Sequence, residues 1–312
     1  MRETASIEGA IVCRGLTRRF GGVRAVDGID LDVPRGQIFA LVGPDGAGKT
    51  TFIRILCGAL APDHGTAIVA GFDVVRDPEA VKARIGYMPQ RFSLYGDLSA
   101  MENLRLYGDI YGVVRDRFRR RAAALLDGFR LLLFADRPAA QLSGGMKQKL
   151  ALACTLIHEP ELLILDEPTT GVDPVSRRQF WRILYTLNGT GITIFVSTPY
   201  MDEAERASRV GLLMEGRLVA CDEPAAIKSQ MAGEILEIIA DPYPTAKQLL
   251  RGHPQVISLE VFGDRLHVLV RSAETARPAL EAALASAGVT VVSMRPTAPS
   301  LEDVFVSAVS MT

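Results

Sequence analysis

One short glycine-rich stretch, residues 43–51, constrains this chain more than any other part of it. It fits the pattern G-x-x-x-x-G-K-[ST] and consists of Gly43, Pro44, Asp45, Gly46, Ala47, Gly48, Lys49, Thr50 and Thr51. The apolar run 38–42 before it predicts a buried strand, and residues 51–56 predict the first turns of a helix. Strand, glycine loop and helix are the context in which this pattern binds phosphate, so the sequence predicts a nucleotide site.

The residue types explain the expected chemistry of this loop. Glycines let the backbone turn tightly and approach an anion closely. The loop N–H groups and the positive end of the following helix then surround phosphates. Lys49 can reach the β- and γ-phosphates, and the Thr50 hydroxyl can bind Mg²⁺. The alternative, a glycine turn with an unrelated lysine, is disfavoured by the flanking strand and helix.

The composition describes an ordinary globular protein. At 312 residues and 48% hydrophobic content, the chain suits one large or two moderate domains. A net charge of −1 predicts no general attraction to nucleic acid or to anionic membranes. The four cysteines are far apart and form no C-x-x-C pattern, which indicates a reducing compartment.

One uncharged run, residues 183–201, is long enough to span a bilayer. Its centre, residues 188–191, reads Asn-Gly-Thr-Gly, and Pro199 lies near its end. We therefore expect a helix end, a turn and a buried strand here. We also expect any membrane role of the chain to depend on a partner.

Two carboxylates follow a second apolar run. Residues 162–165 predict a buried parallel strand, and Asp166 and Glu167 come directly after it, at the edge where ligands bind in open α/β sheets. An Asp in this position can hold Mg²⁺ through a water molecule. The adjacent Glu can orient or deprotonate an attacking water. The alternative is a pair of surface carboxylates, which becomes unattractive beside a phosphate loop.

The remaining patterns predict three further regions. Residues 11–33 suggest an antiparallel layer with turns at 21–22 and 27–28, and residues 101–129 have helical spacing. Ser143 is a suitable N-cap for a helix that continues to about residue 157. Beyond residue 230 the order β-α-β-β-α-β matches a ferredoxin-like arrangement, without a cluster of catalytic residue types.

Over residues 7–228 the chain resembles the ATP-binding subunit of an ABC transporter. Gln90 matches the Q-loop, residues 142–146 match the family signature, and residues 162–168 match the Walker B strand. Residues 171–173 match the D-loop. Phe20, ambiguous by itself between core and ligand contact, matches the aromatic residue that stacks on adenine.

This resemblance implies an α/β fold of the P-loop NTPase type. It implies a RecA-like core, an antiparallel β subdomain and a helical subdomain at about residues 91–160, followed by a ferredoxin-like accessory or regulatory domain at 229–312. It also implies ATP and Mg²⁺ as ligands, with Thr50, Gln90 and Asp166 at the metal, and Glu167 with Gln90 in catalysis. Ser143, Gly144 and Gly145 would contact the ATP held by a second cassette.

The resemblance further implies membrane partners. Residues 92–99, which lead into 102–104, resemble the region that receives the coupling helix of a membrane subunit. Residues 299–305 resemble the tail of drug and polysaccharide exporters with ABC-2-like permease subunits. We expect the chain at the cytoplasmic face of the inner or plasma membrane, bound through those subunits, with a multidrug-efflux-like role.

Three positions depart from the family pattern. Asp45 replaces an Asn, Met146 replaces the signature Gln, and Pro199 stands where the family has the His that contacts the γ-phosphate. Proline has neither a side-chain donor nor an N–H group. We therefore expect good binding but slow hydrolysis at this chain's own site. The departures resemble the first cassette of tandem exporter ATPases, so a heterodimer with a more regular cassette is favoured over a homodimer.

Two other functions stay open at this point. The first is a nucleotide-binding regulatory subunit with little turnover, which Pro199 favours and the intact Lys49, Asp166 and Glu167 disfavour. The second is a non-transport ABC ATPase that acts on ribosomes or DNA. It is disfavoured by the near-neutral charge and by the segment that resembles a coupling region.

Overall fold

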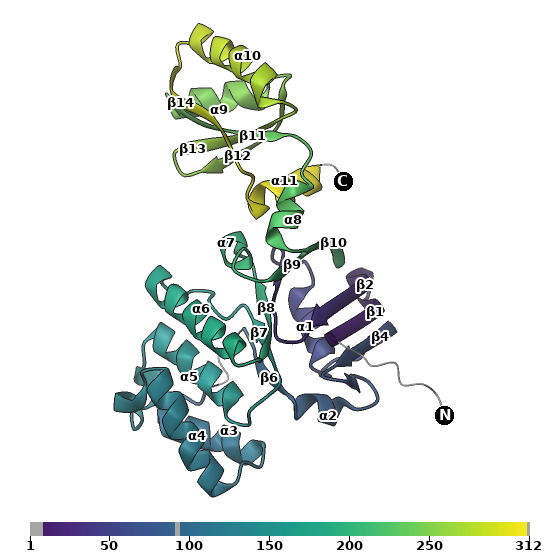
Figure 1. Cartoon of the computed structure of the whole chain (residues 1–312), viewed down its shortest axis with the longest axis vertical. Helices are drawn as coiled ribbons and strands as arrows, with labels where there is room; N and C mark the ends of the chain where they lie inside the picture. The colour runs from purple at the N-terminus through teal and green to yellow at the C-terminus, as the bar shows by residue number, and fades with distance from the viewer. Residues whose placement is uncertain (1–8, 91–93, 311–312) are drawn as a thin grey trace. The chain divides into compact units, whose positions relative to one another are not determined.

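The computed structural model describes residues 9–90 and 94–310, with side chains up to residue 307. The chain divides into two compact units, Met1–Cys221 and Asp222–Thr312 (Figure 1). This division lies slightly before the boundary expected at residues 228/229. Each unit buries a hydrophobic cluster of its own.

A six-stranded sheet with the order β10-β9-β3-β8-β7-β6 forms the core of the first unit. Its central strand β3 pairs in parallel with β8 and β9, and β7 pairs in parallel with β6 and β8. Every residue of β3, β7 and β8 is buried, which explains why these strands appear in the sequence as nearly continuous apolar runs. The strands are β3 (Ile38–Val42), β6 (Ile85–Met88), β7 (Leu162–Asp166), β8 (Thr193–Thr198), β9 (Arg209–Met214) and β10 (Arg217–Asp222).

The first unit also has an antiparallel layer, whose strands β1 and β2 cover the region in which the sequence predicts one. Its order is β2-β1-β4-β5, and it comprises β1 (Gly9–Phe20), β2 (Val23–Pro34), β4 (His64–Val69) and β5 (Phe72–Asp73). The turn expected at Gly21 and Gly22 is present, but the turn expected at Asp27 and Gly28 is wrong because both residues lie inside β2. The register shifts beside them, so the positive φ of Gly28 (68°) accommodates a bulge.

Helices surround both sheets of the first unit. They are α1 (Lys49–Leu56), α2 (Pro78–Lys82), α3 (Ala100–Ile110), α4 (Arg115–Gly128), α5 (Gly144–Leu156), α6 (Pro174–Gly189) and α7 (Met201–Ala204), with short 3₁₀ turns at Leu132–Phe134 and Ala139–Gln141. α1 contacts β7 of the parallel sheet as well as β2 and β4 of the antiparallel layer. α3, α4 and α5 pack on one another and form the expected helical subdomain. α1 therefore holds the glycine loop between two sheets.

The uncharged run at residues 183–201 divides as expected between the end of α6, a turn, and β8. Within the part of the chain that the structure describes, no helix has both the length and the apolar character needed to cross a bilayer.

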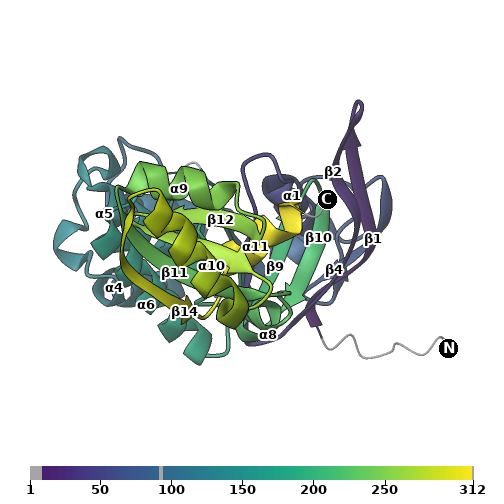
Figure 2. The ribbon, with the colours of Figure 1, turned by 90° about the horizontal axis from the view of Figure 1, so that it is seen from above.

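The second unit has the predicted ferredoxin-like topology. Its sheet has the order β12-β13-β11-β14, and β11 pairs in antiparallel fashion with both neighbours. The elements are α8 (Pro224–Ser229), β11 (Glu234–Asp241), α9 (Tyr243–Arg251), β12 (Val256–Phe262), β13 (Arg265–Val270), α10 (Ala273–Ser286), β14 (Thr290–Thr297) and α11 (Leu301–Ser310). α9 and α10 pack on the sheet and close its core (Figure 2), while α11 contacts β12 and α8.

Candidate functional site

The glycine loop connects β3 to α1, and close backbone contacts explain its glycines. Gly48 has a φ of 105°, and a Cβ there would lie 2.0 Å from the backbone oxygen of Ala25. A Cβ on Gly43 would lie 2.2 Å from the backbone oxygen of Leu213. Since only glycine fits both positions, the loop is held tightly against β2 and β9.

A cavity of about 360 Å³ opens beside this loop. It is lined by Ala25, Asp45, Gly46, Gly48, Lys49, Thr50, Thr51, Gln90 and Glu167. The structure thus brings together most of the loop residues, the Q-loop glutamine and the expected catalytic glutamate. The residues expected at the site that do not line this cavity are Phe20, Gly43, Pro44, Ala47, Ser143, Gly144, Gly145 and Asp166.

Lys49 and Glu167 form an ion pair inside the cavity. The ammonium nitrogen lies 3.1 Å from Glu167 Oε1, and the two side chains are only 4% and 5% exposed. Lys49 also donates to the carbonyl oxygens of Gly43 and Pro44, at 2.8 and 3.1 Å. Gln90 Nε2 donates to Glu167 Oε2 at 2.8 Å. Opposite charges thus compensate each other at a place that a ligand can reach.

The backbone of Glu167 is held in an unusual conformation. Its φ is 49°, which is unfavourable for a residue with a side chain. Its N–H group donates to both the backbone oxygen of Ser197 (3.1 Å) and its hydroxyl oxygen (3.0 Å). Such strain persists only where surrounding contacts impose it, and it is concentrated at functional sites.

Asp166 is fully buried at the end of β7. Burial raises the pKa of its carboxyl group, against the effect of a hydrogen bond from the Ser197 hydroxyl to Oδ1 at 2.6 Å. Oδ2 has no hydrogen-bond partner within the described residues. An unpartnered buried carboxylate oxygen is costly. It therefore fits the role of an acceptor for metal-bound water next to the phosphate loop.

Ser197 and Thr170 belong to the site although the sequence did not predict a role for them. Ser197 bridges Asp166 and the backbone of Glu167, and the Thr170 hydroxyl donates to Glu167 Oε2 at 3.3 Å. A signal for Ser197 was available, because it directly follows the apolar run 192–196 and therefore ends a strand. Only the pairing of β7 with β8 shows that this end faces the two carboxylates.

Pro199 directly follows β8 and is half-buried. The polar network beside it is centred on Glu203, which is fully buried. Glu203 accepts hydrogen bonds from the hydroxyl groups of Thr169, at 2.6 and 2.8 Å, and Thr198, at 2.9 Å, and it lies 3.3 Å from Arg177 Nε. These groups orient the segment after β8, and Pro199 adds no donor to it.

Phe20 lies at the end of β1, where its side chain is 49% exposed and the Arg18 guanidinium group lies 5.0 Å from the ring centroid.

Ser143 caps α5 as predicted, because its hydroxyl oxygen accepts from the N–H group of Met146 at 3.3 Å. A Cβ on Gly145 would lie 2.6 Å from Ser176 Oγ, so this glycine lets α5 approach α6.

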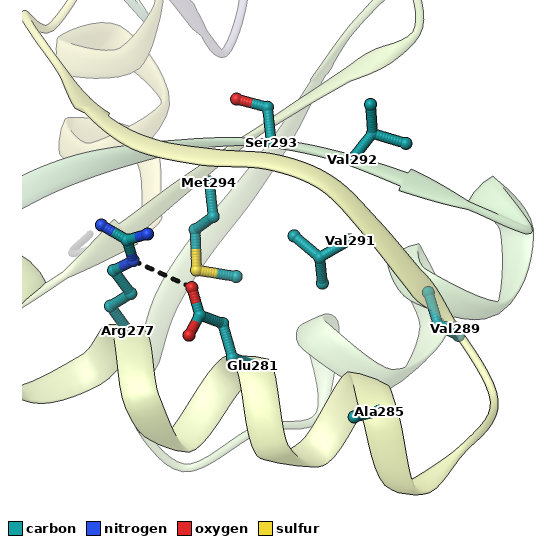
Figure 3. A pocket seen from close by; sticks show the side chains of 8 residues that line it. All are labelled: Arg277, Glu281, Ala285, Val289, Val291, Val292, Ser293 and Met294. Atoms are coloured by element: carbon teal, nitrogen blue, oxygen red, sulfur yellow. Dashed lines mark hydrogen bonds and ion pairs between the residues drawn. The ribbon is translucent and has the colours of Figure 1, made fainter.

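The second unit contains a larger cavity, of about 540 Å³, between α10 and β14 (Figure 3). It is lined by Arg277, Glu281, Ala285, Val289, Val291, Val292, Ser293 and Met294. Arg277 and Glu281 form an ion pair across one helical turn at 2.9 Å, and the other lining groups are mostly apolar. Its one carboxylate, Glu281, is paired with Arg277, and no glycine loop or second carboxylate is among its lining residues, so the glycine loop remains the better candidate.

Comparison with known proteins agrees with this geometry. Residues 26–170 match the family described as "ABC transporter", and residues 223–309 match the "ATP-binding protein DrrA1-3-like, C-terminal domain". The daunorubicin resistance ATP-binding protein DrrA2 of Streptomyces coeruleorubidus is 37% identical over 301 residues, which cover 95% of this chain and 94% of that protein. The chain belongs to the ABC transporter ATP-binding proteins.

Two further similarities extend this result. YbhF of Escherichia coli (strain K12), named a probable multidrug ABC transporter ATP-binding protein, is 41% identical over 304 residues. That alignment covers 96% of this chain and 52% of YbhF, so the chain spans about half the length of this relative. The dimeric post-hydrolysis structure of the cassette MJ0796, bound to ADP and Pi, matches with a TM-score of 0.62 and 25% identity. It covers 68% of this chain and 98% of that one.

Proposed function

We propose that this ABC protein is the ATP-binding and ATP-hydrolysing subunit of an exporter for drug-like compounds. The meeting of Lys49, Glu167 and Gln90 beside the glycine loop carries the proposal. The names of the relatives, multidrug transporter and daunorubicin resistance protein, support the substrate class. The second unit has an accessory or regulatory role in this proposal.

The residues of the cavity suit ATP and its metal ion. The N–H groups of the loop and Lys49 would bind the phosphates, and Thr50, Gln90 and Asp166 would hold Mg²⁺. The bound ion would neutralise phosphate charge. A bound phosphate would replace Glu167 as the partner of Lys49. The released Glu167 carboxylate would then take a proton from the attacking water.

The position of the signature supports a second cassette as partner. Ser143 and Gly144 are exposed at the N-terminus of α5 and do not line the chain's own cavity. A helix N-terminus with a free face binds anions well. We propose that it contacts the γ-phosphate of an ATP molecule held by the other cassette. The dimeric state of the similar cassette MJ0796 supports a second cassette as the partner.

A groove of about 510 Å³ in the first unit suits the coupling helix of an ABC-2-like permease. Cys57, Tyr87, Ile110 and Tyr111 are among its lining residues, and Ile110 is 67% exposed. Such a groove can receive the apolar face of a helix. The sequence predicts that residues 92–99 receive the coupling helix, and of these, residues 92 and 93 lie outside the described part of the chain. We propose that this groove docks the chain to the cytoplasmic face of the membrane.

We further propose that Pro199 slows hydrolysis at this chain's own site, so that a partner cassette with the usual His provides most turnover. Losing one electrostatic contact to a transition state typically costs about 100- to 1000-fold in rate. The same residue supports a second candidate function, a nucleotide-binding regulatory subunit with little turnover.

The test compares the ATPase rates of the full chain, Pro199→His and Pro199→Ala. If the missing imidazole is limiting, Pro199→His raises the rate by about 10-fold or more, and Pro199→Ala, the matched control, does not. Equal rates in all three proteins would show that Pro199 does not limit hydrolysis. ATP binding without turnover in any of them would favour the regulatory subunit.

A further inference from the structure

A second groove in the first unit lies where α4, α5 and α6 meet, side by side in Figure 1. Its volume is about 380 Å³, which is within the size range of small-molecule sites. Its lining residues come from the end of α4 and the segment after it, from Lys149 of α5, and from residues 179–187 of α6, which include Arg182. The groove does not overlap with the nucleotide cavity, since the two have no lining residue in common.

The groove is lined by three cations and no carboxylate. Arg130 and Arg182 are exposed, and Lys149 is half-buried. Within the described residues none of the three forms an ion pair, and the Lys149 ammonium donates instead to the neutral Gln179 Oε1 at 2.8 Å. Burial and the charge of Arg130 both lower the pKa of Lys149. Lys149 and Arg130 therefore repel each other, and no carboxylate among the lining residues compensates their charge.

The backbone of Arg130 gives an independent indication. Its φ is 57°, in the left-handed region that favours glycine, at the position where α4 ends. The N–H group of Arg130 donates to the Asp127 oxygen at 2.9 Å, and that of Leu131 donates to the Leu126 oxygen at 2.7 Å. Glycine would satisfy this turn better than arginine. An arginine in an unfavourable conformation that lines a cationic groove points to a use for its side chain.

Part of the groove lining is apolar. Phe129 is 6% exposed, and Ile183 and Leu187 are half-buried. Cations and apolar side chains in one groove match a ligand with one anionic group and a short hydrocarbon part. We propose that this groove is a binding site for a small amphipathic anion, in which a carboxylate or phosphate is held by Arg130, Lys149 and Arg182.

An occupant would connect three helices of the first unit, two of which begin at segments used in the proposed function. α5 begins at the signature, α6 begins after Asp173, and α4 belongs to the helical subdomain. A bound anion would therefore stiffen the helical subdomain against the core. Binding itself does not require the proposed ATPase activity, so the two ideas can fail separately.

The test is calorimetric titration of the full chain with hexyl phosphate, hexanoate and inorganic phosphate. The protein is first titrated to saturation with Mg-ADP. This step measures nucleotide binding separately and blocks the glycine loop before the anions are added. We expect saturable binding of at least one of the two hexyl compounds. The tighter of the two, hexyl phosphate or hexanoate, identifies the anionic group that the site prefers. Arg182→Gln and Arg130→Gly should each weaken this binding by about 10-fold, because each removes a charge-assisted hydrogen bond.

Arg178→Gln is the matched control, because Arg178 is an exposed cation on α6 that does not line the groove. Its affinity for the anion should equal that of the unmodified chain. Arg130→Gly should also fold at least as well as the unmodified chain, which a thermal melt checks. Absence of saturable binding by both hexyl compounds, or equal weakening in Arg178→Gln, would overturn the site. Binding of inorganic phosphate as tight as that of the hexyl compounds would overturn the apolar part of the proposal.

Discussion

Each unit of the protein buries a glutamate that is held by cations, and the two glutamates differ in what surrounds them. Glu167 in the first unit is paired with one lysine and one amide and lines a cavity. Glu237 in the second unit lies in the middle of β11 and is held by Arg265 and Arg295, both at 2.8 Å. A ligand in the cavity can replace Lys49 and Gln90 as partners of Glu167. Arg265 and Arg295 instead neutralise a carboxylate that has a structural role.

The network around Glu237 continues into the rest of its unit. His267 Nε2 lies 3.9 Å from Glu237, and Nδ1 lies 3.2 Å from Asp303 of α11. Asp303 in turn accepts from the N–H group of Ser300 at 2.7 Å. These contacts connect the last helix to the sheet. The comparison shows that a buried charge indicates chemistry only where a cavity gives a ligand access to it.

The sharpest test of this comparison removes the charge of each glutamate. In a Pro199→His background, where turnover is measurable, Glu167→Gln should lower the ATPase rate by about 100- to 10,000-fold, because the amide cannot accept the proton from water. Glu237→Gln, the matched control, should leave the rate within twofold. Phosphate release by the full chain measures both. A comparable loss in Glu237→Gln would contradict the separation of chemical and structural carboxylates.

A second test compares two glycines with positive φ. Gly48→Ala places a Cβ 2.0 Å from the Ala25 oxygen, whereas Gly263, at the turn between β12 and β13, has nothing within 4 Å of a Cβ. We expect Gly48→Ala to destabilise the first unit by about 3 kcal/mol and to abolish nucleotide binding. Gly263→Ala should cost about 1 kcal/mol, for backbone strain alone.

Urea unfolding measures both glycine variants. The single tryptophan, Trp181, is buried in α6 and reports on the first unit, while far-ultraviolet circular dichroism reports on the whole chain. Equal destabilisation by Gly48→Ala and Gly263→Ala would show that close packing around the glycine loop contributes little.

Local patterns predicted the parts of the fold that depend on neighbouring residues. The glycine loop, the apolar run before Asp166 and the β-α-β-β-α-β order could all be predicted, because periodicity and turn residues act over short distances. The turn at Asp27 and Gly28 was predicted wrongly, since the same residue pair also suits a bulge inside a long strand.

Contacts between distant segments could not be predicted in the same way. Ser197 reaches Asp166 because β8 lies next to β7, and nothing within either strand specifies this neighbour. The groove of Arg130, Lys149 and Arg182 likewise depends on how three helices pack. The family resemblance identified Gln90, but its hydrogen bond to Glu167 required the structure.

The smallest expected effect concerns the pH dependence of the second unit. The hydrogen bond from Arg265 holds the pKa of Glu237 below its usual value. Its contribution to stability is therefore fully present above about pH 4.3, the ordinary value for Glu, and is lost as the pH falls through the lower folded-state value. Hydrogen exchange of the β11 amides should show that Glu237→Gln loosens the sheet at pH 6, and that this difference from the unmodified chain shrinks below about pH 4. A difference that stays constant over this pH range would mean that Glu237 stabilises the sheet by packing. The charge of Glu237 would then not be what distinguishes it from Glu167.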